Sequence, residues 1–349
     1  MKIDRDPRIQ MDSLYFTSPV LEDDMSKHFR EHQATIEKLA GEILRAGRPQ
    51  LYFLGGGASL SAMMSAEYLL NRFTDIPARA LNGVEFLSLA PETVGKNTFI
   101  VLTSWSGESP ELLTAQQYAK SRGAMTIAIT KHDSTPLAAE VDLVIPCPSK
   151  AVYVIPQQIV YLLSACLIRG GKLAPAVGDK LLDDLAKLPK KLGAFVWEAE
   201  EIGKKAAAQF KDVKGIYVVA GGSQYGLGYK LALSVIIENL WINASIINGG
   251  EFYHGPIEII DNGQPPFLFL VGKDASRDHI LRAIQFVQKK DIPHLVFDAA
   301  DYPMENELLA PFYLFVATEW FIMYMSAQRD HDVDERRYMG KVGARWGEF

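Results

Sequence analysis

Residues 99–111 read FIVLTSWSGESPE, an apolar run that leads through a serine-rich turn into a helical pattern. The segment 99–103 has the composition of a buried parallel strand. Pro110 followed by Glu111 suits the first turn of a helix. The hydroxyl and backbone N–H groups of the turn would therefore converge on the positive end of that helix. This arrangement predicts an anion site, and phosphate is the anion it fits best.

Clusters of serine, glycine and proline also occur in ordinary turns, where one serine simply caps the helix. A second stretch favours the phosphate interpretation. Residues 51–61 read LYFLGGGASLS, a short strand followed by a glycine-rich turn and a helix over 62–73. Glycine allows the backbone to approach a ligand closely, and Ser59 would lie at the start of that helix.

Strand-like and helical segments alternate through the first half of the chain, with further strands expected at 78–81, 125–130 and 142–146. This rhythm predicts a parallel sheet covered by helices on both faces. In a flavodoxin-like strand order, 2-1-3-4-5, the first and third strands are neighbours where the winding reverses. The glycine-rich turn and the serine loop would then face each other across one crevice.

The second half repeats the pattern. A strand at 216–220 runs into another glycine-rich turn, and strands are expected at 244–247, 266–271 and 294–297. The loop after the strand at 266–271, GKDASR, has no serine cluster, so we expect one phosphate site per chain. The predicted fold is α/β, with two flavodoxin-like three-layer domains. The predicted divisions are an N-terminal segment and helix (1–48, the helix over 28–46), two domains (49–175 and 176–330) and a tail (331–349).

The overall composition is that of a globular protein: 349 residues, 48% hydrophobic, 22% charged, with a net charge of −6. An acidic balance argues against a nucleic-acid surface. The N-terminus lacks the apolar core of a signal peptide, and no uninterrupted apolar stretch reaches the ~20 residues of a membrane span. These features predict a soluble cytoplasmic protein. Cys147 and Cys166 cannot form a cysteine-rich zinc site and are expected to be small buried hydrophobes.

Glu238 is an acid inside the apolar segment SVIIENLWI. If it is not simply a surface residue, such a carboxylate must be paired, protonated or functional, because burying an isolated charge is costly. Desolvation would raise its pKa toward the range useful for acid–base catalysis.

His254 lies in the segment GGEFYHGP, where glycines and a proline constrain the loop. Histidine titrates near neutral pH, although a single loop histidine is more often structural than catalytic. The charged tail DHDVDERRYMGK is either a solvated end or a segment whose Arg336, Arg337 or Lys341 folds over a phosphorylated substrate.

Together these motifs resemble the SIS (sugar isomerase) family. SWSGES resembles its phosphate loop, GGGAS its first glycine turn, and GEFYHGP the GE-x-x-HGP loop of the isomerase domain of glucosamine-6-phosphate synthase. The resemblance implies phosphate binding by Ser59, Ser104, Ser106 and Ser109, with Glu238 and His254 as the catalytic pair. It also suggests substrate contacts by Gly57, Trp105, Glu251, Arg337 and Lys341. The synthase's glutaminase domain has no counterpart here.

The segments SIINGGEFYHGPIEI and HDVDERRYMGKV are most similar to a catabolic branch, the fructoselysine- and glucoselysine-6-phosphate deglycases. That branch implies cleavage of an Amadori-type sugar-amine phosphate to a hexose 6-phosphate and an amino acid, without metal or organic cofactor. A homodimer or higher homo-oligomer is expected, because His254 could serve a partner's site. Two alternatives remain open: an isomerase or deaminase of amino-sugar phosphates, and a non-catalytic phosphosugar-binding regulator.

Overall fold

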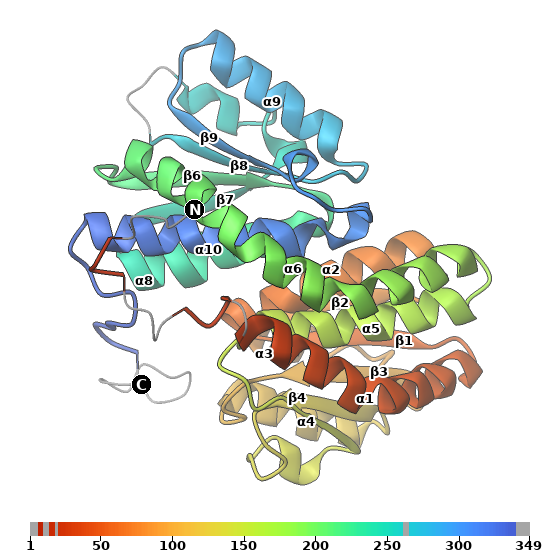
Figure 1. Ribbon diagram of the computed structural model, residues 1–349. Helices are drawn as coiled ribbons and strands as arrows, with labels where there is room; N and C mark the ends of the chain where they lie inside the picture. Colours follow the sequence, from red (N-terminus) through yellow and green to blue (C-terminus); the bar gives the residue numbers. More distant parts are fainter. Residues whose placement is uncertain (1–5, 10–13, 18–19, 261–264, 340–349) are drawn as a thin grey trace. The chain divides into compact units, whose positions relative to one another are not determined.

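The computed structural model describes residues 6–9, 14–17, 20–260 and 265–339. Contacts divide the chain into two compact units. The first unit is built around Asp23–Pro189 and the second around Lys190–Arg336. Each unit contains one parallel sheet, so the predicted duplicated α/β architecture is confirmed (Figure 1).

The first unit holds a five-stranded sheet in the order β2-β1-β3-β4-β5. Its strands are β1 (Gln50–Gly55), β2 (Ala78–Asn82), β3 (Thr98–Thr103), β4 (Met125–Thr130) and β5 (Leu143–Pro146). All four pairings are parallel, and the predicted 2-1-3-4-5 order is confirmed. Every residue of β3 is buried, as its uninterrupted apolar sequence predicted.

Five α-helices accompany this sheet: α1 (Val20–Arg45), α2 (Gly57–Phe73), α3 (Gly83–Leu89), α4 (Pro110–Ser121) and α5 (Val154–Gly170). The expected start of the first helix at residue 28 was wrong, because α1 begins directly after Pro19. The acidic residues near its start conceal an amphipathic pattern in which Leu21 and Met25 are fully buried.

The second unit holds a four-stranded parallel sheet in the order β7-β6-β8-β9. Its strands are β6 (Gly215–Ala220), β7 (Asn243–Asn248), β8 (Phe267–Val271) and β9 (His294–Asp298). Its helices are α6 (Pro175–Phe210, which begins in the first unit), α7 (Tyr225–Tyr229), α8 (Glu238–Leu240), α9 (Arg277–Lys289) and α10 (Ala310–Gln328). The order β7-β6-β8-β9 corresponds to β2-β1-β3-β4, the first four positions of the other sheet.

Short 3₁₀ turns punctuate both units: η2 (Ala138–Glu140), η3 (Gly222–Gln224), η5 (Gly249–Glu251), η6 (Pro256–Ile259), η7 (Ala299–Asp301) and η8 (Glu307–Leu309). The segment 229–241 is not one regular helix but a composite. A π-helix, η4 (Lys230–Ile237), separates α7 from α8. Such wide turns are rare in proteins and are frequent at functional sites. The π-helix η4 ends at Ile237, immediately before Glu238.

Helix α10 is apolar on all sides and forms the core of the second unit. It is long and apolar enough to cross a membrane, but 94% of its most apolar window is buried inside the protein. That burial is typical of the central helix of a packed domain. Trp320 anchors it through an Nε1 hydrogen bond of 2.8 Å to the carbonyl oxygen of Val196 in α6.

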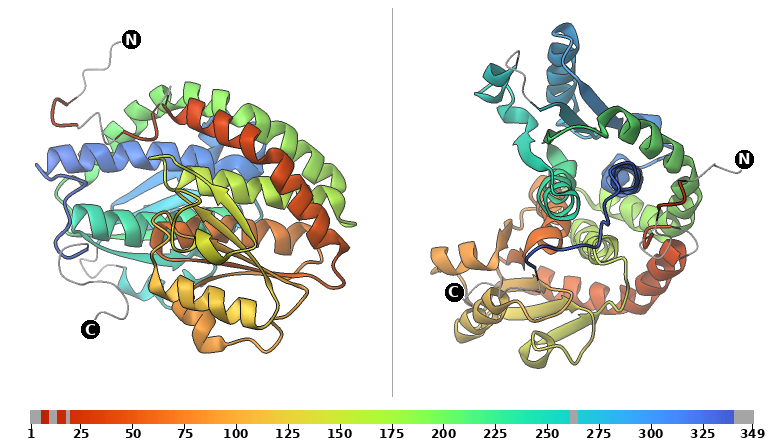
Figure 2. Two further views of the ribbon diagram at one scale, coloured as in Figure 1. Left: turned by 90° about the horizontal axis from the view of Figure 1, so that it is seen from below. Right: turned by 90° about the vertical axis from the view of Figure 1, so that its left-hand side faces the viewer.

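The two faces of the second sheet carry different elements, as the alternation of side chains along β6 shows. Val219 packs in a cluster with Phe252 and with Ile280 of α9. Its neighbours Val218 and Ala220 point the other way, against Gly228 of α7. Figure 1 shows α9 on one side of the sheet and α8 with α10 on the other. In the right-hand view of Figure 2, α10 and the helical segment ending in α8 are seen end-on, side by side.

Candidate functional site

The serine loop between β3 and α4 has the predicted geometry. Ser109 immediately precedes α4 and Pro110 is its first residue. The Ser109 side chain makes no capping hydrogen bond. Its Oγ instead lies 3.1 Å from Oγ of Ser104. The interpretation in which this serine merely caps the helix is therefore not what the structure shows, and the hydroxyl lies beside a helix N-terminus.

Gly107 sets the shape of this loop. Its φ of +67° is in the left-handed region. A Cβ added there would lie 2.5 Å from the side chain of Thr135. Its N–H donates to Ser104 Oγ at 3.2 Å, and the Glu108 N–H donates to Ser106 Oγ at 3.3 Å. Ser104 is buried and internal to the loop, whereas Ser106 is exposed. Position 107 needs a residue that accepts a positive φ and has no Cβ, and only glycine meets both requirements.

Ser59 lies in the first turn of α2, which begins at the exposed Gly57. Ser59 and Trp105 line one small pocket at the carboxyl ends of β1, β3 and β4, together with Thr103 and Thr130. The structure thus brings the glycine-rich turn and the serine loop to one place. Open α/β sheets bind ligands at this edge and at this reversal of strand order.

Lys131 was not singled out in the sequence, yet it lies at this edge. It directly follows β4, and its backbone N–H donates to the carbonyl oxygen of Trp105 at 3.0 Å. Its Nζ lies 4.4 Å from the centre of the Trp105 ring, a cation–π distance. Trp105 is 38% exposed. The sequence signal that could have identified this lysine is its position directly after a strand that neighbours β3. Lys131 supplies a cation beside the predicted phosphate loop.

The equivalent place in the second unit is filled by the protein itself. After β8, the carboxylate of Asp274 accepts hydrogen bonds from N–H and Oγ of Ser223, both at 2.9 Å. It also accepts from N–H and Oγ of Ser276, at 2.9 Å and 2.6 Å. A Cβ on Gly222 (φ +57°) would lie 2.4 Å from this carboxylate. An internal anion occupies the donors of the second glycine-rich turn, which supports the prediction of one phosphate site per chain.

Glu238 begins α8, and its side chain is 27% exposed. The carboxylate is therefore half-buried, between the buried acid and the surface residue that the sequence left open. The requirement for a partner is met, because Arg336 Nε donates to Glu238 Oε1 at 2.9 Å. Arg336 is in turn held by its own donation to the carbonyl oxygen of Val333 at 2.8 Å. A charge-assisted hydrogen bond of this kind helps to fix the direction of a carboxylate.

The tail folds back onto the helix end that carries Glu238. His331 Nε2 contacts the carbonyl oxygen of Asn239 at 2.7 Å, and its ring packs edge-on against Trp241. Arg336 meets Glu238, and the predicted substrate contact of Arg337 stays a prediction. Lys341 lies outside the described residues, so its predicted contact with substrate stays a prediction.

His254 lies on the exposed loop after β7, and its backbone N–H donates to the carbonyl oxygen of Glu251 at 2.9 Å. The loop is anchored below this histidine. Phe252 is fully buried, and Tyr253 Oη donates to the carbonyl oxygen of Arg282 in α9 at 2.9 Å. Both His254 and Glu251 therefore point from a fixed base toward solvent.

Glu238 and His254 lie on opposite faces of the same sheet. Glu238 continues the segment that packs beside α10, whereas the His254 loop packs on α9 (Figure 1). Across the described residues no hydrogen bond or ion pair joins the two side chains. The structure does not bring the predicted catalytic pair together within one copy of the chain.

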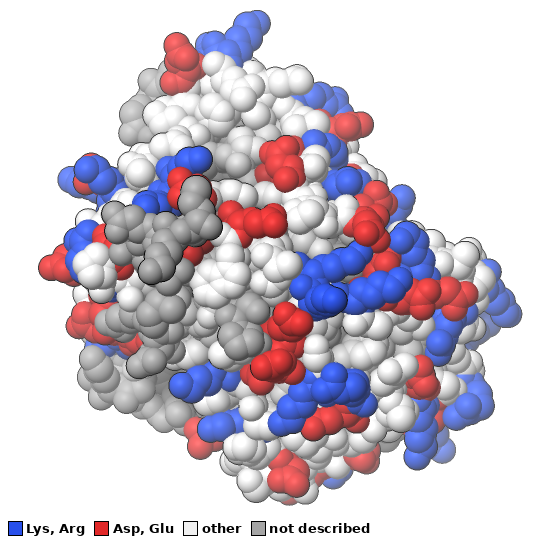
Figure 3. Space-filling model, viewed as in Figure 1, with Lys and Arg blue, Asp and Glu red and all other residues white. Residues whose placement is uncertain are grey.

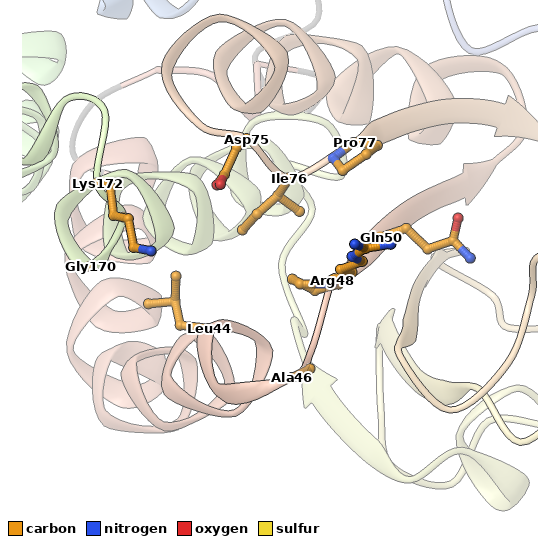
Figure 4. A pocket seen from close by; sticks show the side chains of 11 residues that line it. Leu44, Ala46, Arg48, Gln50, Asp75, Ile76, Pro77, Gly170 and Lys172 are labelled. Atoms are coloured by element: carbon orange, nitrogen blue, oxygen red, sulfur yellow. The ribbon is translucent and has the colours of Figure 1, made fainter.

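A larger cavity, about 660 Å³, lies at the opposite edge of the first sheet. Leu44, Ile76 and Lys172 point into it (Figure 4). It opens at the amino ends of β1 and β2, where parallel sheets do not bind their ligands. On the face drawn in Figure 3, acidic and basic side chains are interspersed over both units, unlike the basic stripe of a nucleic-acid surface.

The model of the SIS domain matches residues 43–168, which lie in the first unit. Fructoselysine 6-phosphate deglycase of Escherichia coli is 33% identical over 307 residues, covering 87% of this chain and 89% of the relative. The chain belongs to the SIS family. Fructosamine deglycase of Bacillus subtilis is 31% identical over 90% of this chain and 97% of its own length.

Solved structures agree with this assignment. A Bacillus subtilis protein solved as a candidate phosphosugar isomerase superposes with a TM-score of 0.79 at 26% identity, covering 91% of this SIS protein and 99% of that chain. Glutamine–fructose-6-phosphate aminotransferase of Corynebacterium efficiens is 25% identical and matches over only 49% of its length. This chain therefore matches about half of the length of the aminotransferase.

Proposed function

We propose that this SIS protein is a phosphosugar deglycase that converts an Amadori-type conjugate, such as fructoselysine 6-phosphate, to glucose 6-phosphate and the free amine. The similarity to two deglycases over nearly the whole length of all three chains carries this proposal. The identity to an aminotransferase is lower, at 25%. We further propose that the enzyme acts in the cytoplasm.

In the proposed site, Ser59 and the serine loop 104–109 bind the phosphate, with Lys131 and the start of α4 contributing positive charge. The starts of α2 and α4, which carry these serines, lie at the carboxyl edge of the first sheet, and this placement supports the role. Binding the phosphate fixes the sugar chain relative to the catalytic groups, which removes much of the entropic cost of reaction. Trp105 would flank the sugar, because it is exposed beside the pocket.

The proposed chemistry is a proton transfer followed by hydrolysis. His254 assists opening of the sugar ring. Glu238, paired with Arg336, removes a proton from C1 of the ketoamine, while the amine nitrogen gives up a proton through water and the C2 carbonyl oxygen gains one. Return of the proton to C2 gives a C1 imine. Water adds to C1, the C1–N bond breaks, and the amine leaves with a proton, so the products are an aldose phosphate and the amino acid.

The placement of Glu238 and His254 on opposite faces of one sheet bears directly on oligomeric state. If both residues act on one substrate, they must come from two copies of the chain. A symmetric dimer provides two such composite sites, each with Glu238 from one copy and His254 from the other. The exposure of the His254 loop supports this arrangement.

Release of glucose 6-phosphate from fructoselysine 6-phosphate tests the proposal. Glu238→Gln and His254→Ala should each lower turnover by about 100-fold or more. Glu258→Gln and His279→Ala, two exposed residues of the second unit, serve as matched controls. Full turnover in both active-site variants contradicts the assigned roles. Ammonia release from glucosamine 6-phosphate, or binding of sugar phosphates without turnover, would contradict the proposed activity itself.

A further inference from the structure

Two histidines and a cysteine converge in the first unit, away from the proposed catalytic groups. His28 and His32 are one turn apart on α1, and Cys147 directly follows β5. One ligand atom from each lies within 4.8 Å of the others. In the part of the chain that the structure describes, this is the one such group of three.

The hydrogen bonds of His32 show which of its ring nitrogens could bind a metal ion. His32 Nε2 lies 2.8 Å from the carbonyl oxygen of Pro146, which can only accept, so this nitrogen carries the proton. The lone pair of neutral His32 is therefore on Nδ1. A histidine that donates its other N–H to a backbone carbonyl is the usual arrangement of a metal ligand.

His28 is 1% exposed, and neither ring nitrogen has a hydrogen-bond partner among the described residues. The nearest charged atom is Oε2 of Glu31, 3.8 Å from Nδ1. Burying polar atoms without partners is costly, and an orphaned buried group calls for an explanation. Burial lowers the pKa of His28, which favours the neutral imidazole that binds metals.

We propose that His28, His32 and Cys147 bind one Zn²⁺ ion. Two imidazoles and a thiolate are a donor set typical of zinc. Zn–N distances of about 2.1 Å and a Zn–S distance of about 2.3 Å put tetrahedral donors roughly 3.5 Å apart. Small rotations of the three side chains, about 1 Å at the donor atoms, close the group to that spacing.

The ion would fasten α1 to the segment that follows β5. This segment also holds the serine loop, because the carbonyl oxygen of Ser149 accepts from Trp105 Nε1 at 3.0 Å. Cys147 itself lines the pocket beside Ser59. The zinc site is therefore structural and positioning: it fixes the wall of the phosphate pocket, while the chemistry proposed above involves no metal.

Cobalt(II), whose thiolate complexes absorb in the near ultraviolet, provides a direct test on the full-length protein after removal of metals with a chelator. We expect one equivalent of Co²⁺ to bind with a thiolate-to-cobalt charge-transfer band and to be displaced by Zn²⁺. Cys147→Ser should abolish the band and weaken Zn²⁺ binding by at least about 100-fold. Cys166→Ser, at the other buried cysteine, is the matched control and should keep both.

His32→Ala gives an independent variant at a half-buried position and should also lose the ion. Circular dichroism verifies that each variant is folded. Absence of the band in the wild type, its persistence in Cys147→Ser, or its loss in folded Cys166→Ser would overturn the proposal. None of these readouts depends on deglycase activity. A result that overturns the zinc site therefore leaves the proposed function standing, and loss of the proposed function leaves the zinc site standing.

Discussion

Replacing Asp274 by alanine should destabilise the second unit more than any surface substitution. Its carboxylate is 7% exposed and accepts four hydrogen bonds from Ser223 and Ser276. Two of the donors are hydroxyls, which can turn to other acceptors. The other two are backbone N–H groups, which cannot.

The magnitude follows from those two backbone groups. A buried donor such as the Ser223 N–H costs about 1–3 kcal/mol when left without a partner, and the half-buried Ser276 N–H costs less, so Asp274→Ala should lower the free energy of unfolding by about 2–4 kcal/mol. The loss should be local as well, because the turn 221–224 is held by this carboxylate. Asp212→Ala, at a side chain that is 89% exposed, should change stability by less than about 0.5 kcal/mol.

Urea unfolding measures the global effect, and hydrogen exchange of the peptides containing Ser223 and Ser276 measures the local one. We expect faster exchange in Asp274→Ala and partial restoration by formate, an anion the size of the deleted carboxylate. The structure identifies the carboxylate as a built-in replacement for a bound anion. Wild-type stability and exchange in Asp274→Ala would refute that reasoning, and so would formate stabilising both proteins equally.

Three further outcomes are expected in the first unit. Ser59→Ala should weaken sugar-phosphate binding about 10- to 150-fold, measured by calorimetry, because a hydrogen bond to a charged group contributes about 1.5–3 kcal/mol. Ser61→Ala should not weaken it, because that hydroxyl donates to the backbone of its own helix. Gly107→Ala, strained at its positive φ, should cost about 1–3 kcal/mol of stability, whereas Gly47→Ala, in open space, should cost almost nothing. Burial raises the pKa of Glu67, so its stabilising contribution is present at low pH and lost as pH rises through the raised value. The stability of Glu67→Gln relative to the wild type should therefore be higher at pH 8 than at pH 4, measured by denaturant unfolding.

Both sheets were predictable from the sequence, because parallel strands buried on two faces are continuous apolar runs. The strand order followed from the reversal point, and the serine loop from Pro110 and the residues before it. The π-helix before Glu238 was not predictable, since its residues are as apolar as those of a regular helix. The early start of α1 was hidden by acidic residues that cover a buried stripe.

The sequence motifs of the site were predictable, but the contacts between its side chains were not. Arg336 meets Glu238 across 98 residues of sequence, and no local pattern encodes such a pairing. Asp274 appeared only as part of a loop without a serine cluster, and its hydrogen bonds to Ser223 and Ser276 could not be predicted from that loop alone. The opposite placement of Glu238 and His254 depends on which face each crossover takes, which becomes visible only in the folded sheet.

Mixing Glu238→Gln with His254→Ala tests the central claim, a deglycase site shared between two copies of the chain. Each variant alone should be nearly inactive on fructoselysine 6-phosphate. After equal amounts are mixed and subunits exchange, half of the dimers should be hybrids, each with one intact site, restoring about a quarter of wild-type activity. A mixture that undergoes exchange yet stays as inactive as its components would contradict the claim.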